Sequence, residues 1–178
     1  MDGIADGSRS EEEAFKIELL MKQEHITSTD RSTVSPALVR AETTGAPCCS
    51  NGNFPKREKV SQEKTGDLLG ACAALLLNAL KDLAGIDHDK HIIAPTAIEP
   101  IQMLKTKYLG SKNPRLHTDE ILIALSATAA ESEDAKLALA QLPQLHGCQV
   151  HSSVMLSEVD KKTFQRLGCD VTCEPKFQ

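Results

Sequence analysis

The sequence lacks a long apolar run and any segment typical of a membrane anchor or a secretory signal. Its longest uninterrupted apolar stretch, Ala71–Leu77, is far shorter than the roughly 18 residues that a membrane-spanning helix needs. The first ten residues are acidic and contain Gly, and they have no apolar centre like that of a signal peptide. We therefore expect a protein without membrane contact, located in the cytoplasm.

The sequence also lacks concentrated positive charge. Its 20 Lys and Arg residues are scattered among 25 Asp and Glu residues, and the net charge is −5. A protein that follows a phosphate backbone carries its basic residues in a patch or stripe, so nucleic acid is not expected as a partner. At 178 residues the chain is long enough for one sizeable core. Two large domains are not expected.

Cysteine is present, but not in a spacing that builds a metal site. The chain has six cysteines and no signal segment, so we expect reduced thiols. Cys72 lies within an Ala- and Leu-rich helix and is expected in the core. Cys148, Cys169 and Cys173 lie in or beside expected strands, and their spacing does not match a zinc motif. No metal and no cofactor are predicted.

Several catalytic signatures are absent from the sequence. It has no His-Glu-x-x-His motif of zinc peptidases, no Gly-x-Ser-x-Gly nucleophile elbow and no zinc-deaminase pattern. Lys64-Thr65 lacks the glycines that precede the lysine of a phosphate-binding P-loop. The sequence therefore contains no complete catalytic motif, and it leaves open whether the protein is an enzyme.

The N-terminal third is expected to be partly helical. Residues 1–10 have the composition of a disordered tail. Residues 11–43 are predicted to form a helical hairpin, whose first helix has an acidic first turn and a wide apolar stripe that includes Phe15 and Leu19. Residues 44–65 are polar and rich in turn residues, and they are predicted to form a loop or a weak hairpin.

Residues 66–178 are predicted to form one α/β domain. Apolar residues recur at helical spacing in several segments and alternate or cluster in shorter ones. The expected helices are 68–83, 98–108, 118–130, 133–141 and 161–167, and the expected strands are 92–94, 148–156 and 169–173. Strands separated by helices of this length indicate a mostly parallel sheet with helices on its faces.

The segment Leu109–Leu125, Leu-Gly-Ser-Lys-Asn-Pro-Arg-Leu-His-Thr-Asp-Glu-Ile-Leu-Ile-Ala-Leu, is long and unusual in composition. It resembles the C-terminal domain of domain-of-unknown-function family 1846, also called uncharacterised protein family 0371. The resemblance extends to 99–102, 147–153 and 167–168, and more weakly to 16–21 and 42–45.

This resemblance implies a three-layer α/β/α C-terminal domain preceded by helices, and it implies no established activity. Proteins of the family are much longer. The chain is therefore expected to be a detached C-terminal fragment or a shortened relative, with a separate N-terminal part of the family protein or a second copy of itself as a partner.

A polar loop ahead of one expected helix is the candidate functional site. Cationic and amide donors here precede a helix that Thr118 is expected to cap. Such donors at the positive end of a helix favour a small anionic ligand, for example phosphate or carboxylate. A neighbouring strand could add further polar groups. The candidate ligand-binding residues are Lys112, Asn113, Arg115, His117, Glu120, His151 and Ser152, with Ser153 beside them.

The same loop also has a purely structural interpretation. Lys112 and Arg115 can pair with acidic neighbours, the Asn-Pro pair between them can form the turn, and His117 with Thr118 can cap the helix. Ion pairs and caps are the commoner use of such residues. This interpretation stays open beside the ligand site.

Three functions are compatible with these observations. The first and favoured one is a non-catalytic structural or assembly domain, because no catalytic constellation is complete. The second is an anion- or nucleotide-binding module centred on residues 111–117. The third is an enzyme that uses His117 or His151 as an acid or base together with Glu120. A fold alone does not choose among them.

Overall fold

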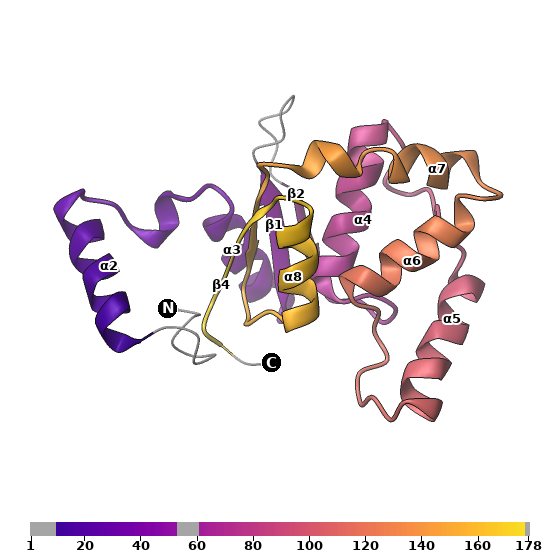
Figure 1. Cartoon of the computed structure of the whole chain (residues 1–178), viewed down its shortest axis with the longest axis horizontal. Helices are drawn as coiled ribbons and strands as arrows, with labels where there is room; N and C mark the ends of the chain where they lie inside the picture. The colour runs from indigo at the N-terminus through magenta and orange to yellow at the C-terminus, as the bar shows by residue number, and fades with distance from the viewer. Residues whose placement is uncertain (1–9, 53–60, 177–178) are drawn as a thin grey trace.

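The computed structural model describes residues 10–52 and 61–176 (Figure 1). Except for Ser10, the tail predicted for residues 1–10 lies outside the described residues, and so do residues 53–60 of the predicted loop. The described part combines one β-sheet with helices packed around it. The α/β class predicted from the sequence is confirmed.

The sheet has four strands in the order β2-β1-β3-β4. The strands are β1 (Cys48–Gly52), β2 (Ser61–Lys64), β3 (Gln149–Ser152) and β4 (Asp170–Cys173). β1 pairs antiparallel with both β2 and β3, and only β3 and β4 are parallel. The prediction of a mostly parallel sheet is therefore wrong. The parallel β3–β4 pair is joined through a helix, as expected, but β1 enters the sheet from the N-terminal segment and runs against its neighbours.

One of the two structures predicted for residues 44–65, a hairpin, is present in the described residues, and one predicted strand does not form. β1 and β2 lie where a loop or weak hairpin was expected, and every residue of β1 is buried. β1 is hard to recognise in the sequence because its residues are mostly polar. A strand that is covered on both faces also need not show alternating apolar and polar residues. The expected strand 92–94 is irregular; Ile92 and Ile93 are buried in the core instead. Their apolar character reflects packing rather than sheet formation.

Helices form within the segment 11–43 that was predicted as a helical hairpin. They are α2 (Glu11–Gln23), the short 3₁₀ helix η1 (Ser28–Asp30) and α3 (Val34–Thr44). Ser10 and Glu13 close a reciprocal capping box at the start of α2. Pro36 lies within the first turn of α3, where no intrahelical donor is lost. In Figure 1, α3 lies beside the sheet, whereas α2 lies apart from it.

The remaining helices follow the sequence expectations closely. They are α4 (Ala71–Ala84), α5 (Pro95–Met103) with its π-helical continuation η2 (Leu104–Tyr108), α6 (Thr118–Thr128), α7 (Glu133–Leu139), η3 (Leu142–Leu145) and α8 (Glu158–Arg166). Gly85 ends α4 in the left-handed conformation, with φ of 72°. Ser132 and Ser157 cap α7 and α8, as predicted. Among the described residues, no helix is long and apolar enough to span a bilayer.

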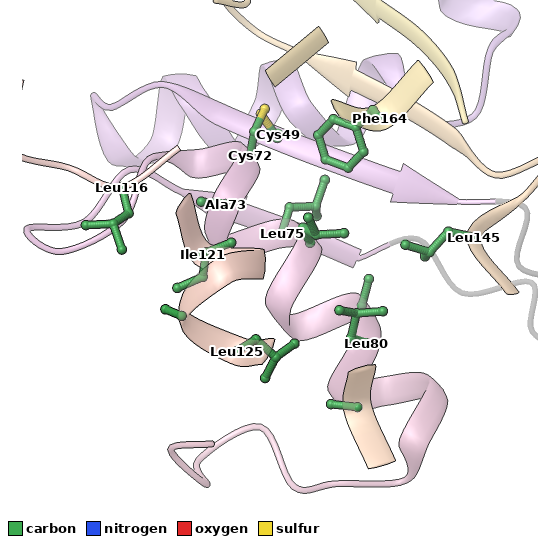
Figure 2. Packing of buried hydrophobic residues seen from close by; sticks show 14 of the residues in the cluster. Cys49, Cys72, Ala73, Leu75, Leu80, Leu116, Ile121, Leu125, Leu145 and Phe164 are labelled. Carbon is green, nitrogen blue, oxygen red and sulfur yellow. The ribbon is translucent and has the colours of Figure 1, made fainter. Parts of the chain in front are cut away.

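The main core lies between the sheet and the helices α4, α6 and α8 (Figure 2). Leu75 and Leu80 of α4, Leu125 of α6 and Phe164 of α8 are almost fully buried there. Cys72 belongs to this core, as predicted. On the other face of the sheet, the Ser50 hydroxyl donates to a backbone carbonyl just ahead of α3. Helices therefore pack on both faces of the sheet.

Candidate functional site

A pocket of about 330 Å³ opens beyond the carboxyl end of β3. Its walls come from the start of α4, from residues 113–117 ahead of α6, and from residues 154–157 ahead of α8. The N-cap residues of these helices, Gly70, His117 and Ser157, all line the pocket. Three helix N-termini therefore meet at one cavity.

The N-terminus of α4 is the one without a side-chain cap. Its N-cap is Gly70, which offers no side-chain oxygen, and the Gly70 amide donates to the Leu116 carbonyl at 3.2 Å. The amides of the first helical turn have no acceptor within the helix. Two residues of that turn, Ala71 and Cys72, line the pocket. The positive end of the α4 dipole thus faces the cavity.

Asp160 ties the other two helix N-termini together. One carboxylate oxygen accepts the Thr118 amide of α6 at 2.9 Å. The other accepts the Ser157 hydroxyl at 2.7 Å and lies 2.9 Å from Nδ1 of His117. The carboxylate therefore fixes the imidazole ring of His117 at the wall of the pocket.

The His117–Asp160 pair shifts both protonation equilibria. Burial favours the neutral form of Asp160, but hydrogen bonds from His117, Thr118 and Ser157 outweigh it and lower the pKa below its ordinary 3.8. The hydrogen bond to Asp160 raises the pKa of His117 above its ordinary 6.5, against the opposing effect of burial. Together these shifts favour an imidazolium–carboxylate pair.

The two polar loop residues nearest His117 also line the pocket. The Arg115 Nε donates to the Gly66 carbonyl at 2.6 Å, which holds the guanidinium at the pocket wall. Asn113 Oδ1 accepts the Arg115 amide at 3.1 Å, so Asn113 forms the turn that the structural interpretation expected. Lys112 is exposed and is not among the lining residues. The structure thus brings Asn113 and Arg115, but not Lys112, to the cavity.

Glu120 has a structural position. Its Oε2 accepts the His117 amide at 2.8 Å and lies 2.7 Å from Nζ of the buried Lys105. The N-cap of α6 is His117, and Thr118 is the first helical residue, so the cap lies one residue earlier than expected. The ring of His117 is bonded to Asp160, not to the predicted partner Glu120.

The strand residues separate onto two faces. Ser152 lines the pocket, whereas His151 points to the α3 face, since consecutive strand residues alternate. There its Nδ1 lies 2.8 Å from the Thr172 hydroxyl and its Nε2 lies 3.4 Å from a Glu174 carboxylate oxygen. The Ser153 hydroxyl accepts a backbone amide of β1 at 3.0 Å. The structure therefore does not bring His151 to the candidate site.

Sequence reasoning missed three contributors to the pocket. Ser157 and Asp160 were recognised only as a helix cap, and Gly70 was not singled out. Asp160 is 43 residues from His117 in the chain, so no local spacing connects them. The available signals were the Ser-x-x-Asp pattern and a glycine immediately ahead of an apolar helix.

Two thiols lie at the floor of the same pocket. Cys49 of β1 and Cys72 of α4 are close together in Figure 2 and both line the cavity. A hydrogen bond to Cys49 and burial raise the pKa of Cys72 well above its ordinary 9.0. The Cys72 thiol is therefore neutral near pH 7 and does not repel an anion. In the part of the chain that the structure describes, no group of three or more His, Cys, Asp or Glu side chains is placed to hold a metal ion.

Fold and pocket together define an α/β domain with a mixed sheet and a cavity at converging helix N-termini. Residues 29–178 match the family model described as domain of unknown function DUF1846, C-terminal. The chain belongs to this family, which confirms the resemblance inferred from its sequence.

Its relatives include bacterial proteins of much greater length. The chain is 48% identical over 178 residues to a UPF0371 protein of Corynebacterium glutamicum, covering 98% of this chain and 36% of that protein. It is 49% identical over 162 residues to one of Corynebacterium urealyticum, covering 91% and 32%, respectively. Identity to one of Streptococcus pyogenes serotype M5 is 45% over 163 residues, covering 92% and 33%. The chain thus spans about a third of the length of these relatives.

Proposed function

We propose that this domain binds a small anionic group, a phosphate or a carboxylate, in the pocket where α4, α6 and α8 begin. The observation that carries the proposal is the convergence of the three N-termini on one cavity, with that of α4 uncapped. Backbone amides and helix dipoles at such ends form ready anion sites. Arg115 adds a guanidinium, which can donate two directed hydrogen bonds to one anion.

The Asp160 carboxylate also lines the pocket, and its charge opposes an anion. Its oxygens, however, are engaged by the Thr118 amide, the Ser157 hydroxyl and the His117 ring. Once His117 is protonated, the imidazolium balances the carboxylate, and Arg115 and the helix dipoles then give the cavity a net positive potential. Anion binding should therefore strengthen as the pH falls through the raised pKa of His117.

A second candidate function, acid–base catalysis, is favoured by the same pair. In a His–carboxylate pair the carboxylate holds one ring nitrogen and leaves the other directed at a reactant. Nδ1 of His117 contacts Asp160, and Nε2 makes no hydrogen bond within the described residues. His117 is the better of the two histidines for this role, since His151 is buried on the other face. This candidate needs a bound ligand first, so anion binding remains the primary proposal.

The proposal differs in emphasis from the structural role that the sequence favoured. An assembly role and a ligand site do not exclude each other, because the residues that line the pocket differ from those on the exposed surface of α2. The cytoplasmic location stays a prediction from the sequence.

Thermal unfolding in the presence of inorganic phosphate tests the proposal. Ligand that binds only the folded state raises Tm with the logarithm of its concentration above Kd. We expect this rise for the wild type relative to sodium chloride of equal ionic strength. Arg115→Ala should weaken phosphate binding by roughly ten- to a hundredfold, the equivalent of about 1.5–3 kcal/mol for hydrogen bonds to a charged group.

Lys112→Ala is the matched control, because Lys112 carries the same charge three residues away without lining the pocket. It should retain the phosphate response. If Arg115→Ala lowers Tm without ligand, and phosphate shifts neither protein more than chloride does, the loop is structural only and the proposal fails.

A further inference from the structure

The helix α2 carries large apolar side chains that nothing in the described chain covers. Phe15 is 66% exposed, Leu20 is 59% exposed and Leu19 is 48% exposed, and no residue of α2 is buried. In Figure 1 the helix lies apart from the sheet and the core. Contiguous exposed apolar side chains of this kind mark interaction surfaces.

The apolar residues of α2 lie on more than one side of the helix. Each residue turns the helix by about 100°, so Ile17 lies roughly opposite the side shared by Phe15 and Leu19. Ile17 is itself 42% exposed. A simple pair of helices from two copies would bury a single stripe. A helix with two apolar sides fits better into a groove of a larger body.

The relatives indicate what that body is. The C-terminal family model begins at residue 29, so α2 precedes the domain it describes. The alignment with the Corynebacterium glutamicum protein covers 98% of this chain, and therefore includes α2, but only 36% of the longer protein. In that relative, the segment aligned with α2 therefore precedes the C-terminal domain, and most of the protein lies outside the alignment.

We propose that α2 is a docking helix, and that its occupant is the part of a UPF0371 protein that lies outside the aligned third. The exposed apolar sides of α2 insert into a groove of that polypeptide, while the pocket at the start of α4 stays on the far side of the sheet from α3. This proposal is independent of anion binding, because it uses no residue of the pocket.

Co-expression tests the proposal. This chain, untagged, is produced together with an affinity-tagged polypeptide that comprises the unaligned part of the Corynebacterium glutamicum relative. The molar mass of the purified material is measured by light scattering after gel filtration. The wild type should co-purify as a one-to-one complex. A double variant, Phe15→Glu with Ile17→Glu, places charge on both apolar sides and should weaken the complex at least tenfold.

The matched control is Val39→Glu, which places the same charge on α3 at a side chain that is 60% exposed. It should leave the complex intact. Both variants should keep the wild-type Tm of the isolated chain, because neither site is buried. The proposal is overturned if the wild-type chain does not co-purify with the tagged polypeptide, whether or not that polypeptide is soluble. It is equally overturned if the double variant binds as well as wild type, or if the chain alone forms a dimer that needs Phe15.

Discussion

Two histidines near the end of β3 share a bonding pattern but differ in their access to solvent. Nδ1 of His117 lies 2.9 Å from Asp160, and Nδ1 of His151 lies 2.8 Å from Thr172. The His117 side chain is 30% exposed at a pocket, whereas that of His151 is 4% exposed. The same residue type thus lines a pocket in one case and lies within a closed polar network in the other.

The difference follows from the alternation of β3. Ser152 and His151 are neighbours in the chain, yet Ser152 lines the pocket and His151 lies on the face that α3 covers. We therefore propose a binding role only for residues on the open side. The predictions below separate the two histidines by stability, ligand response and pH.

The largest expected effect is that of Asp160→Ala. The carboxylate accepts hydrogen bonds from two helix N-termini and is mostly buried. Removing a buried, paired charge costs about 3 kcal/mol of the free energy of unfolding, measurable by urea denaturation. Asp119→Ala, an exposed neighbour in the first turn of α6, should cost less than about 1 kcal/mol. Equal losses for the two variants would contradict the central role of Asp160.

His151→Ala should be the next most destabilising change. It leaves the Glu174 carboxylate and the Thr172 hydroxyl without their partner under α3, and we expect a loss of about 2 kcal/mol. The phosphate-dependent rise in Tm should be the same as in the wild type. A folded His151→Ala protein that no longer responds to phosphate would show that the two faces are not separate.

A smaller effect is expected in the pH dependence of stability. The raised pKa of His117 contributes to the free energy of unfolding. This contribution is fully present below pH 6.5, the ordinary pKa of the group, and is lost as the pH rises through the raised pKa. The lowered pKa of Asp160 also contributes to the free energy of unfolding. This contribution is fully present above pH 3.8, the ordinary pKa of the group, and is lost as the pH falls through the lowered pKa. The pair therefore stabilises the fold most between these two pH values.

His117→Gln removes the titrating ring and should flatten the decline of Tm on the alkaline side. Tm measured from pH 4 to pH 9 for both proteins checks this. An unchanged alkaline decline in His117→Gln would assign it to another group.

The sequence was sufficient for most helices, because their apolar periodicity and their capping residues are local. The Ser132 and Ser157 caps and the Gly85 end of α4 were all predicted. Strands were harder to predict. β1 has the polar sequence Cys-Cys-Ser-Asn-Gly, and it is buried by contacts with β2, β3, α3 and α4 that no local pattern encodes.

The candidate site was predicted in part. Arg115, Asn113 and His117 come from one loop, so their proximity was evident from the sequence. Their partner Asp160 comes from a helix far along the chain, and the pocket exists only because α4, α6 and α8 begin at the same place. Residue type and spacing could not show that the Glu120 carboxylate would pair with Lys105, or that the His151 side chain would lie on the face of the sheet away from the pocket.

The central claim, anion binding where three helices begin, is tested most directly by amide chemical shifts. Inorganic phosphate is added to ¹⁵N-labelled protein at constant ionic strength. The account predicts saturable shifts for the Ala71 and Cys72 amides at the uncapped start of α4, and for the His117 ring, with no change along α2. Shifts at Ala71 and Cys72 no larger than those produced by chloride, or saturable shifts confined to another part of the chain, would contradict it.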